Sequence, residues 1–417
     1  FKYTLGKDKP ELILTVTGPD GNEVTEISGL THKVVQDREN KSISGFDVTT
    51  TNGLITIANK KTITATTDAK EEQYTLKITF VNYEGDQTAN ATSTLSAKVM
   101  IQKEKIVQTV ANICKSGQSL SSCIAAMNGI DETLYHHDTS LTNGAGDNSY
   151  RYAGASGEVN NYVCFGSTQS PCPEDNKYRI IGVFGDKVKL IKYDYASSNL
   201  LGTDGDYYDT DIPDASYYKG SLTSIDLYHW NYESTNSETN TWSTSLLNKV
   251  NLNTNFITNI GKEWSNKIAT TTWKVGGNTY ANIRNVIPAT AYQNEIVNPV
   301  TTNTTDNATE YSAKIGLMYV SDYGFAAEPS AWTLTMGNYD NTTATSTNWM
   351  HMGLYEWTIS RGADISDIVF YVYGGGKVYC DSVYYGDTAV RPSFNLESSI
   401  TYVSGDGTQN SPIRITD

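Results

Sequence analysis

Seven short segments in the first hundred residues alternate apolar and polar side chains, which constrains this part of the chain to a sandwich of β-strands. The segments are LILTVTG, HKVV, GFDVTT, LITIA, TITATT, QYTLKITFVN and TLSAKVMIQ, and turn sequences such as GPDGN and TTNG separate them. Successive side chains of a strand point to opposite sides, so this alternation places the apolar residues of each strand on one face, toward a core. We therefore predict an immunoglobulin-like β-sandwich over residues 1–103.

Four of the five cysteines form two close pairs, Cys114 with Cys123 and Cys164 with Cys172. Neither pair has the C-x-x-C spacing of zinc knuckles or thioredoxins. Short-range disulfides are typical of exported proteins, so we expect both pairs to be bridged. The alternative is four reduced, buried thiols in a cytosolic protein. Cys380 is expected to be a buried thiol in a strand.

The segment between the cysteines Cys114 and Cys123 predicts a helical hairpin. Apolar residues precede it at helical spacing, at Ile106, Val107, Val110 and Ile113. One continuous helix would separate the two cysteines by about 13 Å, too far for a disulfide. We expect residues 104–146 to be a helical hairpin and linker that form a stiff spacer between domains.

The remainder, residues 147–417, reads as one large α+β unit. RIIGVF and KVKLIKY are apolar strands joined by the two-residue turn Gly185-Asp186. Helical spacing between 243 and 269 predicts two or three short helices, from Leu246, Leu247, Val250, Phe256, Ile260, Trp264 and Ile268. Strand-like runs then return, so the whole chain is expected to be mainly β plus α+β.

The net negative charge of the chain limits the kinds of partner that it can bind. The formal net charge of -15 argues against nucleic acid or an anionic membrane, because those surfaces require Lys/Arg patches. No run approaches the roughly 20 apolar residues of a membrane helix. No signal peptide is visible, so we expect a mature or trimmed form of an exported, extracellular protein.

An acidic segment could supply oxygen ligands for calcium. Asp204, Asp206, Asp209 and Asp211 follow one another closely, and Ca²⁺ prefers six to eight oxygens from a flexible loop. The spacing is not that of an EF-hand. The alternative is a solvated acidic loop without a cofactor.

Other constellations are weaker. His136, His137 and Asp138 could contact zinc, but adjacent side chains point apart, so we interpret them as polar loop residues. GGGK at 374–377 lacks the spacing of a phosphate loop and predicts a hairpin tip. Neither G-x-S-x-G nor H-E-x-x-H occurs, and nothing singles out two of the 46 acidic residues as a catalytic pair. We do not expect an enzyme.

Residues 353–396 contain GLYEWTISR, YVYGGGKVYCDSVYYGD and VRPSFNL. This layout resembles the last third of the formylglycine-generating-enzyme and C-type-lectin-like fold, which implies that a Trp-bearing strand and a terminal strand frame a long ligand loop. The paired catalytic cysteines of the enzyme branch have no counterpart here. Residues 147–417 also resemble a widespread bacterial surface domain of unknown function, with landmarks such as DNSYRY, NKYRIIGVF and VRPSFNLESSITYVSG. The chain departs from that pattern at roughly 204–232.

The stretch YTLKITFVNYEGDQTANATSTLSAKVMI resembles the closing strands of camelysin-type biofilm-fibre subunits, and FKYTL looks like the mature start of that family. Phe1, Tyr3 and Leu5 alternate with polar residues, so this strand could pair with the sheet edge of a neighbouring subunit. The alternative is pairing within its own sandwich.

Aromatic residues are the strongest indication of a binding site. Tyrosine has a large apolar face and a polar hydroxyl, which suits recognition of sugars or proteins. We predict ligand-binding residues in the implied loop and near the enlarged one: Tyr371, Tyr373, Tyr379, Asp381, Tyr384, Tyr385 and Trp230. Simple sheet packing is the alternative for each. The sequence thus predicts a bacterial cell-surface adhesive protein that binds glycan or protein, or else a fibre or pilus subunit that assembles with identical subunits by strand donation.

Overall fold

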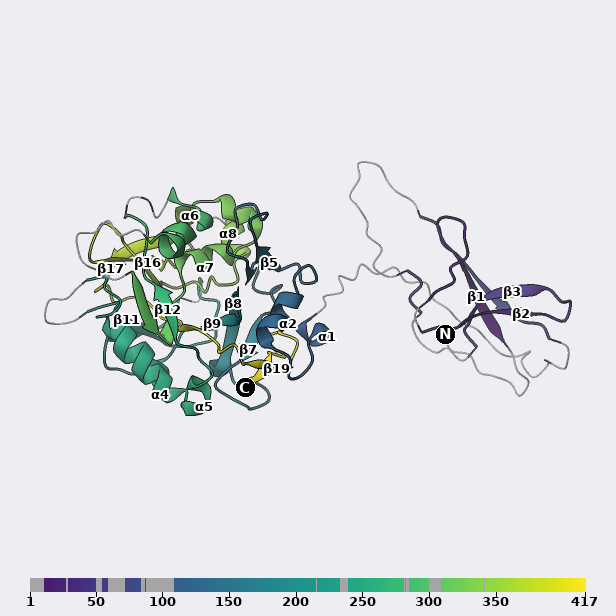
Figure 1. Cartoon of the computed structure of the whole chain (residues 1–417), viewed down its shortest axis with the longest axis horizontal. Coiled ribbons are helices and arrows are strands. Elements are labelled where there is room, and N and C mark those ends of the chain that lie inside the picture. The colour runs from purple at the N-terminus through teal and green to yellow at the C-terminus, as the bar shows by residue number, and fades with distance from the viewer. Residues whose placement is uncertain are drawn as a thin grey trace. The chain divides into compact units, whose positions relative to one another are not determined.

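The computed structural model describes residues 11–27, 29–49, 55–58, 72–83, 87, 109–214, 216–232, 239–280, 282, 285–299, 309–340 and 342–417. Two compact units make up the chain, Phe1–Lys105 and Ile106–Asp417. Both contain antiparallel β-sheet, and the second adds short helices (Figure 1). The chain is therefore mainly β with an α+β element, as the sequence predicts.

The first unit contains a four-stranded antiparallel sheet in the order β2-β3-β1-β4. Its strands are β1 Leu12–Thr17, β2 His32–Gln36, β3 Ser42–Asp47 and β4 Thr75–Phe80. Leu14 of β1 lies opposite Phe46 on one side and Ile78 on the other. Burial of these apolar side chains drives the pairing, with a core of Leu12, Leu14, Val16, Ile27, Phe46 and Val48.

Four of the seven predicted segments are therefore strands. Residues 55–58 lie in irregular structure, and the other two predicted segments, 62–67 and 94–102, lie outside the described residues. Phe1, Tyr3 and Leu5 also lie outside them. The sheet is consistent with one layer of a sandwich.

The second unit is built on a seven-stranded antiparallel sheet in the order β14-β18-β9-β8-β6-β5, with β7 paired to β8. The strands are β5 Leu134–His137, β6 Ser149–Tyr152, β7 Tyr162–Cys164, β8 Lys177–Phe184, β9 Lys187–Lys192, β14 Ile315–Gly316 and β18 Ser393–Asn395. The predicted hairpin is β8–β9, where Val183 lies opposite Val188 across the turn at Gly185. Gly185 has φ +63°, which favours glycine because it has no Cβ.

The second unit also contains smaller sheets. They are β10 Tyr207–Asp211 with β11 Ile225–Tyr228, β12 Thr271–Lys274 with β13 Glu310–Ala313, β19 Thr401–Ser404 with β20 Arg414–Thr416, and the three-stranded sheet β15 Glu356–Arg361, β16 Ile368–Val372 and β17 Val378–Ser382. The chain between β18 and β20 passes close to the start of the unit, because Leu120 N–H donates to Ile400 O at 2.9 Å.

The helices are short. They are α1 Val110–Ile113, α2 Leu120–Ala126, α3 Ser198–Leu201, α4 Ile257–Asn259, α5 Lys262–Ser265, α6 Pro288–Tyr292, α7 Val320–Phe325 and α8 Thr342–Ser346, with the single helical turns η2 Glu174–Asn176, η6 Pro329–Thr333 and η7 Met336–Asn338 and the wider helices η3 Leu247–Phe256 and η5 Gln293–Val297. The segment η3–α4–α5 covers the predicted helical region. In the described part of the chain, no helix has the length and hydropathy of a membrane span.

The predicted spacer is instead part of the second unit. Leu120, Cys123, Ile124 and Met127 of the α1–α2 hairpin are buried in the main hydrophobic core, and β5 joins the seven-stranded sheet. Apolar side chains on both helices favour burial over exposure as a free-standing spacer. The hairpin geometry itself is as predicted.

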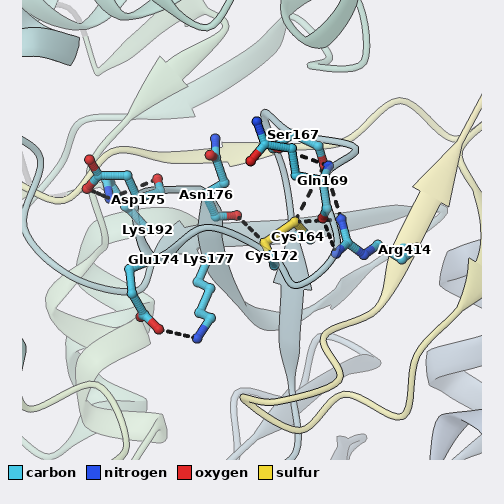
Figure 2. The surroundings of a disulfide bond; sticks show 10 residues. All are labelled: Cys164, Ser167, Gln169, Cys172, Glu174, Asp175, Asn176, Lys177, Lys192 and Arg414. Carbon is cyan, nitrogen blue, oxygen red and sulfur yellow. Dashed lines mark hydrogen bonds and ion pairs between the residues drawn. A yellow bond between two sulfur atoms is a disulfide. The ribbon is translucent and has the colours of Figure 1, made fainter.

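Both predicted disulfides are present. The Cα–Cα distance is 5.5 Å between Cys114 and Cys123 and 5.9 Å between Cys164 and Cys172. The second bridge closes the loop between β7 and β8, and Arg414 of β20 holds that loop (Figure 2). The Arg414 guanidinium donates to the backbone oxygen of Gln169 at 2.5 Å. Cys380 is buried in β17, as predicted.

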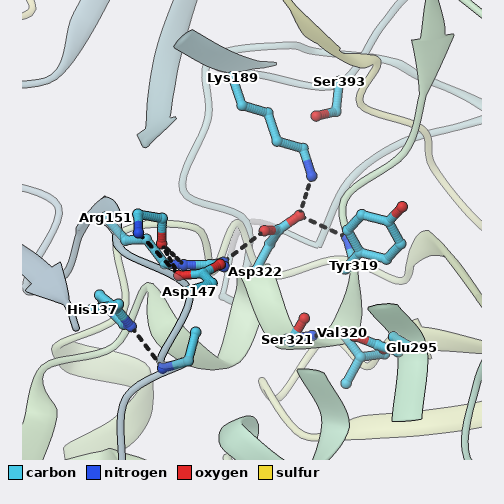
Figure 3. A network of polar contacts seen from close by, with 12 residues as sticks. His137, Asp147, Arg151, Lys189, Glu295, Tyr319, Val320, Ser321, Asp322 and Ser393 are labelled. Carbon is cyan, nitrogen blue, oxygen red and sulfur yellow. Dashed lines mark hydrogen bonds and ion pairs between the residues drawn. The ribbon is translucent and has the colours of Figure 1, made fainter. Parts of the chain in front are cut away.

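A buried cluster of charges joins β6, β9 and α7 (Figure 3). The carboxylate of Asp322 accepts from Lys189 Nζ at 2.5 Å and from Arg151 Nη1 at 3.3 Å. Asp147 pairs with Arg151 at 2.7 Å. A buried charge needs such partners, because water no longer solvates it.

A second buried ion pair, Glu356 with Arg391, connects β15 to the segment before β18. Arg391 donates from Nε and Nη2 to the two carboxylate oxygens of Glu356, each at 2.8 Å. Its Nη2 also donates to Met350 O at 2.6 Å. This two-point geometry fixes both side chains.

Replacing Glu356 with Gln is expected to lower the free energy of unfolding of the second unit by about 3–5 kcal/mol, because Arg391 then keeps a buried charge without its carboxylate. All seven tryptophans lie between residues 230 and 357, so their fluorescence in a denaturant titration follows this unit alone. The matched control is Glu310→Gln, which removes a surface pair with Lys274 and should cost less than about 1 kcal/mol. Equal losses in both variants would contradict the role of the buried pair.

Glu295 makes stability depend on pH. Burial raises its pKa to about 7 from 4.5, although Ser360 Oγ donates to one oxygen at 2.5 Å and Ser321 N–H to the other at 3.1 Å. Between these two pH values the folded chain keeps a proton that the unfolded chain releases, so the free energy of unfolding falls as pH rises. The loss reaches about 3 kcal/mol above pH 7.

Glu295→Gln should therefore become more stable relative to the unsubstituted protein, by about 3 kcal/mol, between roughly pH 4.5 and pH 8. Denaturant titrations at a series of pH values measure this difference. Glu263→Gln, on the exposed side of α5, is the control and should show no such change. A pH-independent difference for Glu295→Gln would show that the Glu295 carboxyl ionises alike in both states.

Candidate functional site

One face of the sheet β15–β16–β17 carries a row of aromatic rings, which we call the aromatic face. Trp357 lies opposite Tyr371, and Tyr371 lies opposite Tyr379, so the three share a side of the sheet. Side chains two residues apart on a strand also share a side. The aromatic face consists of Tyr355, Trp357, Tyr371, Tyr373 and Tyr379.

The rings contact one another in sequence from the core to the surface. The centroid distances are 5.9 Å for Trp357–Tyr371, 5.5 Å for Tyr371–Tyr355 and 4.8 Å for Tyr355–Tyr373. These are ordinary aromatic contact distances. Trp357 and Tyr371 are buried, whereas Tyr373 is 36% exposed and Tyr379 half-buried. The row therefore emerges at the end of the sheet where β16 turns into β17.

Side-chain hydrogen bonds fix the turn between β16 and β17. Tyr323 Oη donates to the carbonyl of Gly376 at 2.6 Å, and His351 Nε2 donates to that of Gly374 at 3.0 Å. A Cβ on Gly376 would lie 2.4 Å from Thr345 Cγ2, and its φ is +101°. Only glycine fits there. The GGGK sequence is thus a hairpin tip, as predicted, and its position is fixed.

Charged groups border the aromatic face. Lys377 Nζ lies 5.1 Å from the ring centre of Tyr373 and 5.8 Å from that of Tyr379. A cation over a ring at this distance is attracted to it. Asp381, half-buried on β17, lies two residues from Tyr379 and so on the same side of the sheet. Asp387 is exposed, and Tyr385 Oη donates to it at 3.5 Å.

The phenols of Tyr371 and Tyr385 are hydrogen-bond donors at neutral pH. Burial, and then the charge of Asp381, raises the pKa of Tyr371 above its ordinary value. Burial raises the pKa of Tyr385 too, with Asp387 and Asp381 adding to the shift. A protonated phenol beside a carboxylate offers both a donor and an acceptor to a ligand.

Tyr384 is 44% exposed and lies beside a second aromatic cluster rather than in the row. In this cluster the His229 ring lies 5.0 Å from that of Tyr208 and 4.6 Å from that of Tyr232. Burial lowers the pKa of His229, and hydrogen bonds with the backbone of Tyr384 and Tyr385 oppose the shift. The structure thus divides the predicted ligand residues between two neighbouring patches.

The prediction for Trp230 is wrong. Its side chain is fully buried, its Nε1 donates to Thr358 O at 3.0 Å, and its ring lies 5.0 Å from that of Trp242. It packs beneath the sheet that carries the aromatic face. A ligand cannot reach it without unfolding this core.

The acidic segment does not form the predicted loop either. It begins at the turn before β10 and continues along that strand, so its side chains diverge. Asp206 is buried, and its two oxygens accept from Tyr232 N–H at 2.9 Å and Leu247 N–H at 2.8 Å. Asp204, Asp209 and Asp211 are exposed. Asp206 is therefore bound to the start of η3 inside the protein, whereas the other three carboxylates are exposed.

Metal ligands are not gathered in the described residues, where no three His, Cys, Asp or Glu side chains are placed to hold an ion. His136 and His137 lie on β5 rather than in a loop. His137 is buried and its Nδ1 accepts from Ala145 N–H at 3.1 Å, while His136 stacks on Tyr150 with a centroid distance of 4.4 Å. Adjacent strand residues face opposite sides, which separates the two imidazoles.

Four residues of the site were not predicted from the sequence: Tyr355, Trp357, Lys377 and Asp387. The sequence could have indicated Tyr355, because it lies two residues before Trp357 and residues two apart on a strand share a face. Lys377 could not be assigned, since its place over Tyr373 depends on the conformation of the turn.

Comparisons with protein-family models, curated proteins and solved structures give no significant match. The functional interpretation therefore rests on the geometry of the site.

Asp206→Asn is expected to lower the free energy of unfolding by about 1–3 kcal/mol, because a carboxylate oxygen that accepts a buried N–H is replaced by an amide donor. Asp209→Asn is the matched control and should change it by less than about 0.5 kcal/mol. Tryptophan fluorescence during denaturant unfolding measures both. Two results together would support the predicted metal site instead. Both substitutions would change the free energy of unfolding only slightly, and both would remove a rise in melting temperature that calcium causes in the unsubstituted protein.

Proposed function

We propose that the second unit is a binding module of an exported bacterial surface protein, and that it binds glycans at the aromatic face. The observation that carries this proposal is a row of tyrosine rings in contact with one another, with Lys377 and two carboxylates beside them, at the fixed end of a three-stranded sheet. The first unit then serves as its attachment or assembly domain.

The chemistry of the face suits a sugar. The apolar C–H face of a pyranose ring can stack on an aromatic ring, and Tyr373 offers such a ring at the surface. Sugar hydroxyls are both donors and acceptors, and the protonated phenol of Tyr385 beside the carboxylate of Asp387 matches both roles. A protein ligand that presents a planar apolar side chain would use the same face.

A fixed binding surface loses little conformational entropy when a ligand binds. The hydrogen bonds from Tyr323 and His351 to the β16–β17 turn hold Tyr373 and Lys377 before a ligand arrives. Buried Tyr371 and Trp357 support the exposed rings from below. This support favours recognition by pre-formed contacts.

The proposal includes the finer architecture expected from sequence resemblance, a C-type-lectin-like second unit and an immunoglobulin-like first unit. Two disulfides support an extracellular location, because such bonds persist in oxidising compartments. Binding is favoured over catalysis because the span that resembles the enzyme branch contains Cys380 alone, and this residue is buried in a strand.

Tyr373→Ala and Tyr379→Ala are expected to weaken glycan binding by about 2 kcal/mol each, or roughly thirtyfold, because each removes an aromatic contact at the centre of the site. A glycan array identifies a ligand, and calorimetric titration measures its affinity. Tyr280→Ala, which removes an exposed tyrosine outside the aromatic face, is the control. Circular dichroism confirms that each variant is folded.

Two outcomes would contradict the proposal. One is unchanged affinity in both variants with a measurable ligand. The other is binding of a protein but of no glycan, which would assign the face to protein recognition.

A further inference from the structure

Two reactive side chains meet in the interior of the second unit. Lys189 Nζ lies 2.5 Å from Asp322 Oδ2, and both side chains are almost completely buried (Figure 3). Lys189 belongs to β9 and Asp322 to α7, and 133 residues separate them in the chain. They therefore approach each other only in the folded protein.

Aromatic rings surround the amine. Nζ lies 4.4 Å from the ring centre of Tyr319, 5.2 Å from that of Trp273 and 5.8 Å from that of Phe184. These rings exclude water, and burial lowers the pKa of Lys189. Burial therefore shifts the amine toward its neutral, nucleophilic form, and the charge of Asp322 opposes this shift.

The carboxyl group of Asp322 is held by donors to both of its oxygens. Arg151 Nη1 donates to Oδ1 at 3.3 Å, and Tyr319 N–H donates to Oδ2 at 3.0 Å. When an amine adds to a carboxyl carbon, negative charge develops on an oxygen, and a positioned donor stabilises it. Arg151 is placed to do this for Oδ1, while Oδ2 faces the amine.

If the charges of Lys189 and Asp322 were both removed, no buried charge would be left without a partner. Arg151 keeps Asp147 as a partner at 2.7 Å. Glu295 is mostly uncharged below neutral pH, because burial raises its pKa to about 7. By contrast, an intact ammonium and carboxylate must both stay desolvated, which is costly even for a well-paired ion pair.

We propose that Lys189 and Asp322 condense into an intramolecular amide after the chain folds. The bond between Nζ and Cγ forms and the bond between Cγ and Oδ2 breaks. The ammonium gives up two protons, which leave with Oδ2 as one water molecule. Oδ1 becomes the amide oxygen and keeps its hydrogen bond from Arg151. The reaction needs no other reactant, and it links β9 covalently to α7.

The full chain tests this directly. Its intact mass is measured after denaturation and reduction of the disulfides, and the expected value is the sequence mass minus one water. Tandem mass spectrometry of a tryptic digest should then locate the loss in a branched peptide that joins Lys189 to Asp322. Lys189→Arg keeps the charge but is a poor nucleophile, so this variant should have its full sequence mass.

A second variant gives an independent prediction. Asp322→Asn can form the same amide by releasing ammonia, so the linked variant should have the mass of the linked unsubstituted protein. A folded, unsubstituted chain with its full sequence mass would overturn the proposal and leave an ion pair. Loss of water that maps to any other residue would also overturn it.

Discussion

The sheet that carries the aromatic face contacts the segments next to the seven-stranded sheet through backbone hydrogen bonds and a buried ion pair. In the described residues the two sheets share no strand ladder, although Trp357 N–H donates to Ala389 O at 3.2 Å. The ion pair of Glu356 and Arg391 crosses this junction inside the core. Because a buried charge cannot exchange its partner for water, the pair fixes where β15 begins. The position of β15 in turn determines where the rings of the aromatic face reach the surface.

Local features of this fold could be predicted from the sequence. The β8–β9 hairpin follows from a two-residue turn with glycine, and both disulfides follow from cysteines eight or nine residues apart. The hairpin of α1 and α2 follows from the same spacing. Each of these predictions depends on residues that are close in the chain, so no knowledge of the tertiary arrangement is needed.

The buried charges could not be predicted in this way. Lys189 lies in a strand whose pattern suggests an outward-facing lysine, and its partner Asp322 lies on a helix beyond several loops. Asp206 in an acidic run likewise looks solvated until Tyr232 and Leu247 supply its N–H donors. In both cases the partner is far away in the sequence. Whether the charged side chain is buried depends on which distant segments pack over it.

Tyrosine is ambiguous for a related reason. Tyr371 and Tyr373 are two residues apart and share a face, yet one is buried and the other exposed. The difference arises because β16 ends between them. Trp230 was assigned to the site on composition, and the structure places it beneath the same sheet. A cluster of aromatic residues therefore indicates where a site lies more reliably than it indicates which rings contact the ligand.

The central claim is that ligands bind at the aromatic face. NMR spectra of the protein with isotope-labelled tyrosine rings, recorded during titration with a glycan that binds, test it most directly. The expected result is that the signals of Tyr355, Tyr373 and Tyr379 shift with the ligand, while that of fully buried Tyr152 does not. Shifts confined to Tyr208 and Tyr232 would place the ligand at the neighbouring cluster and contradict the account.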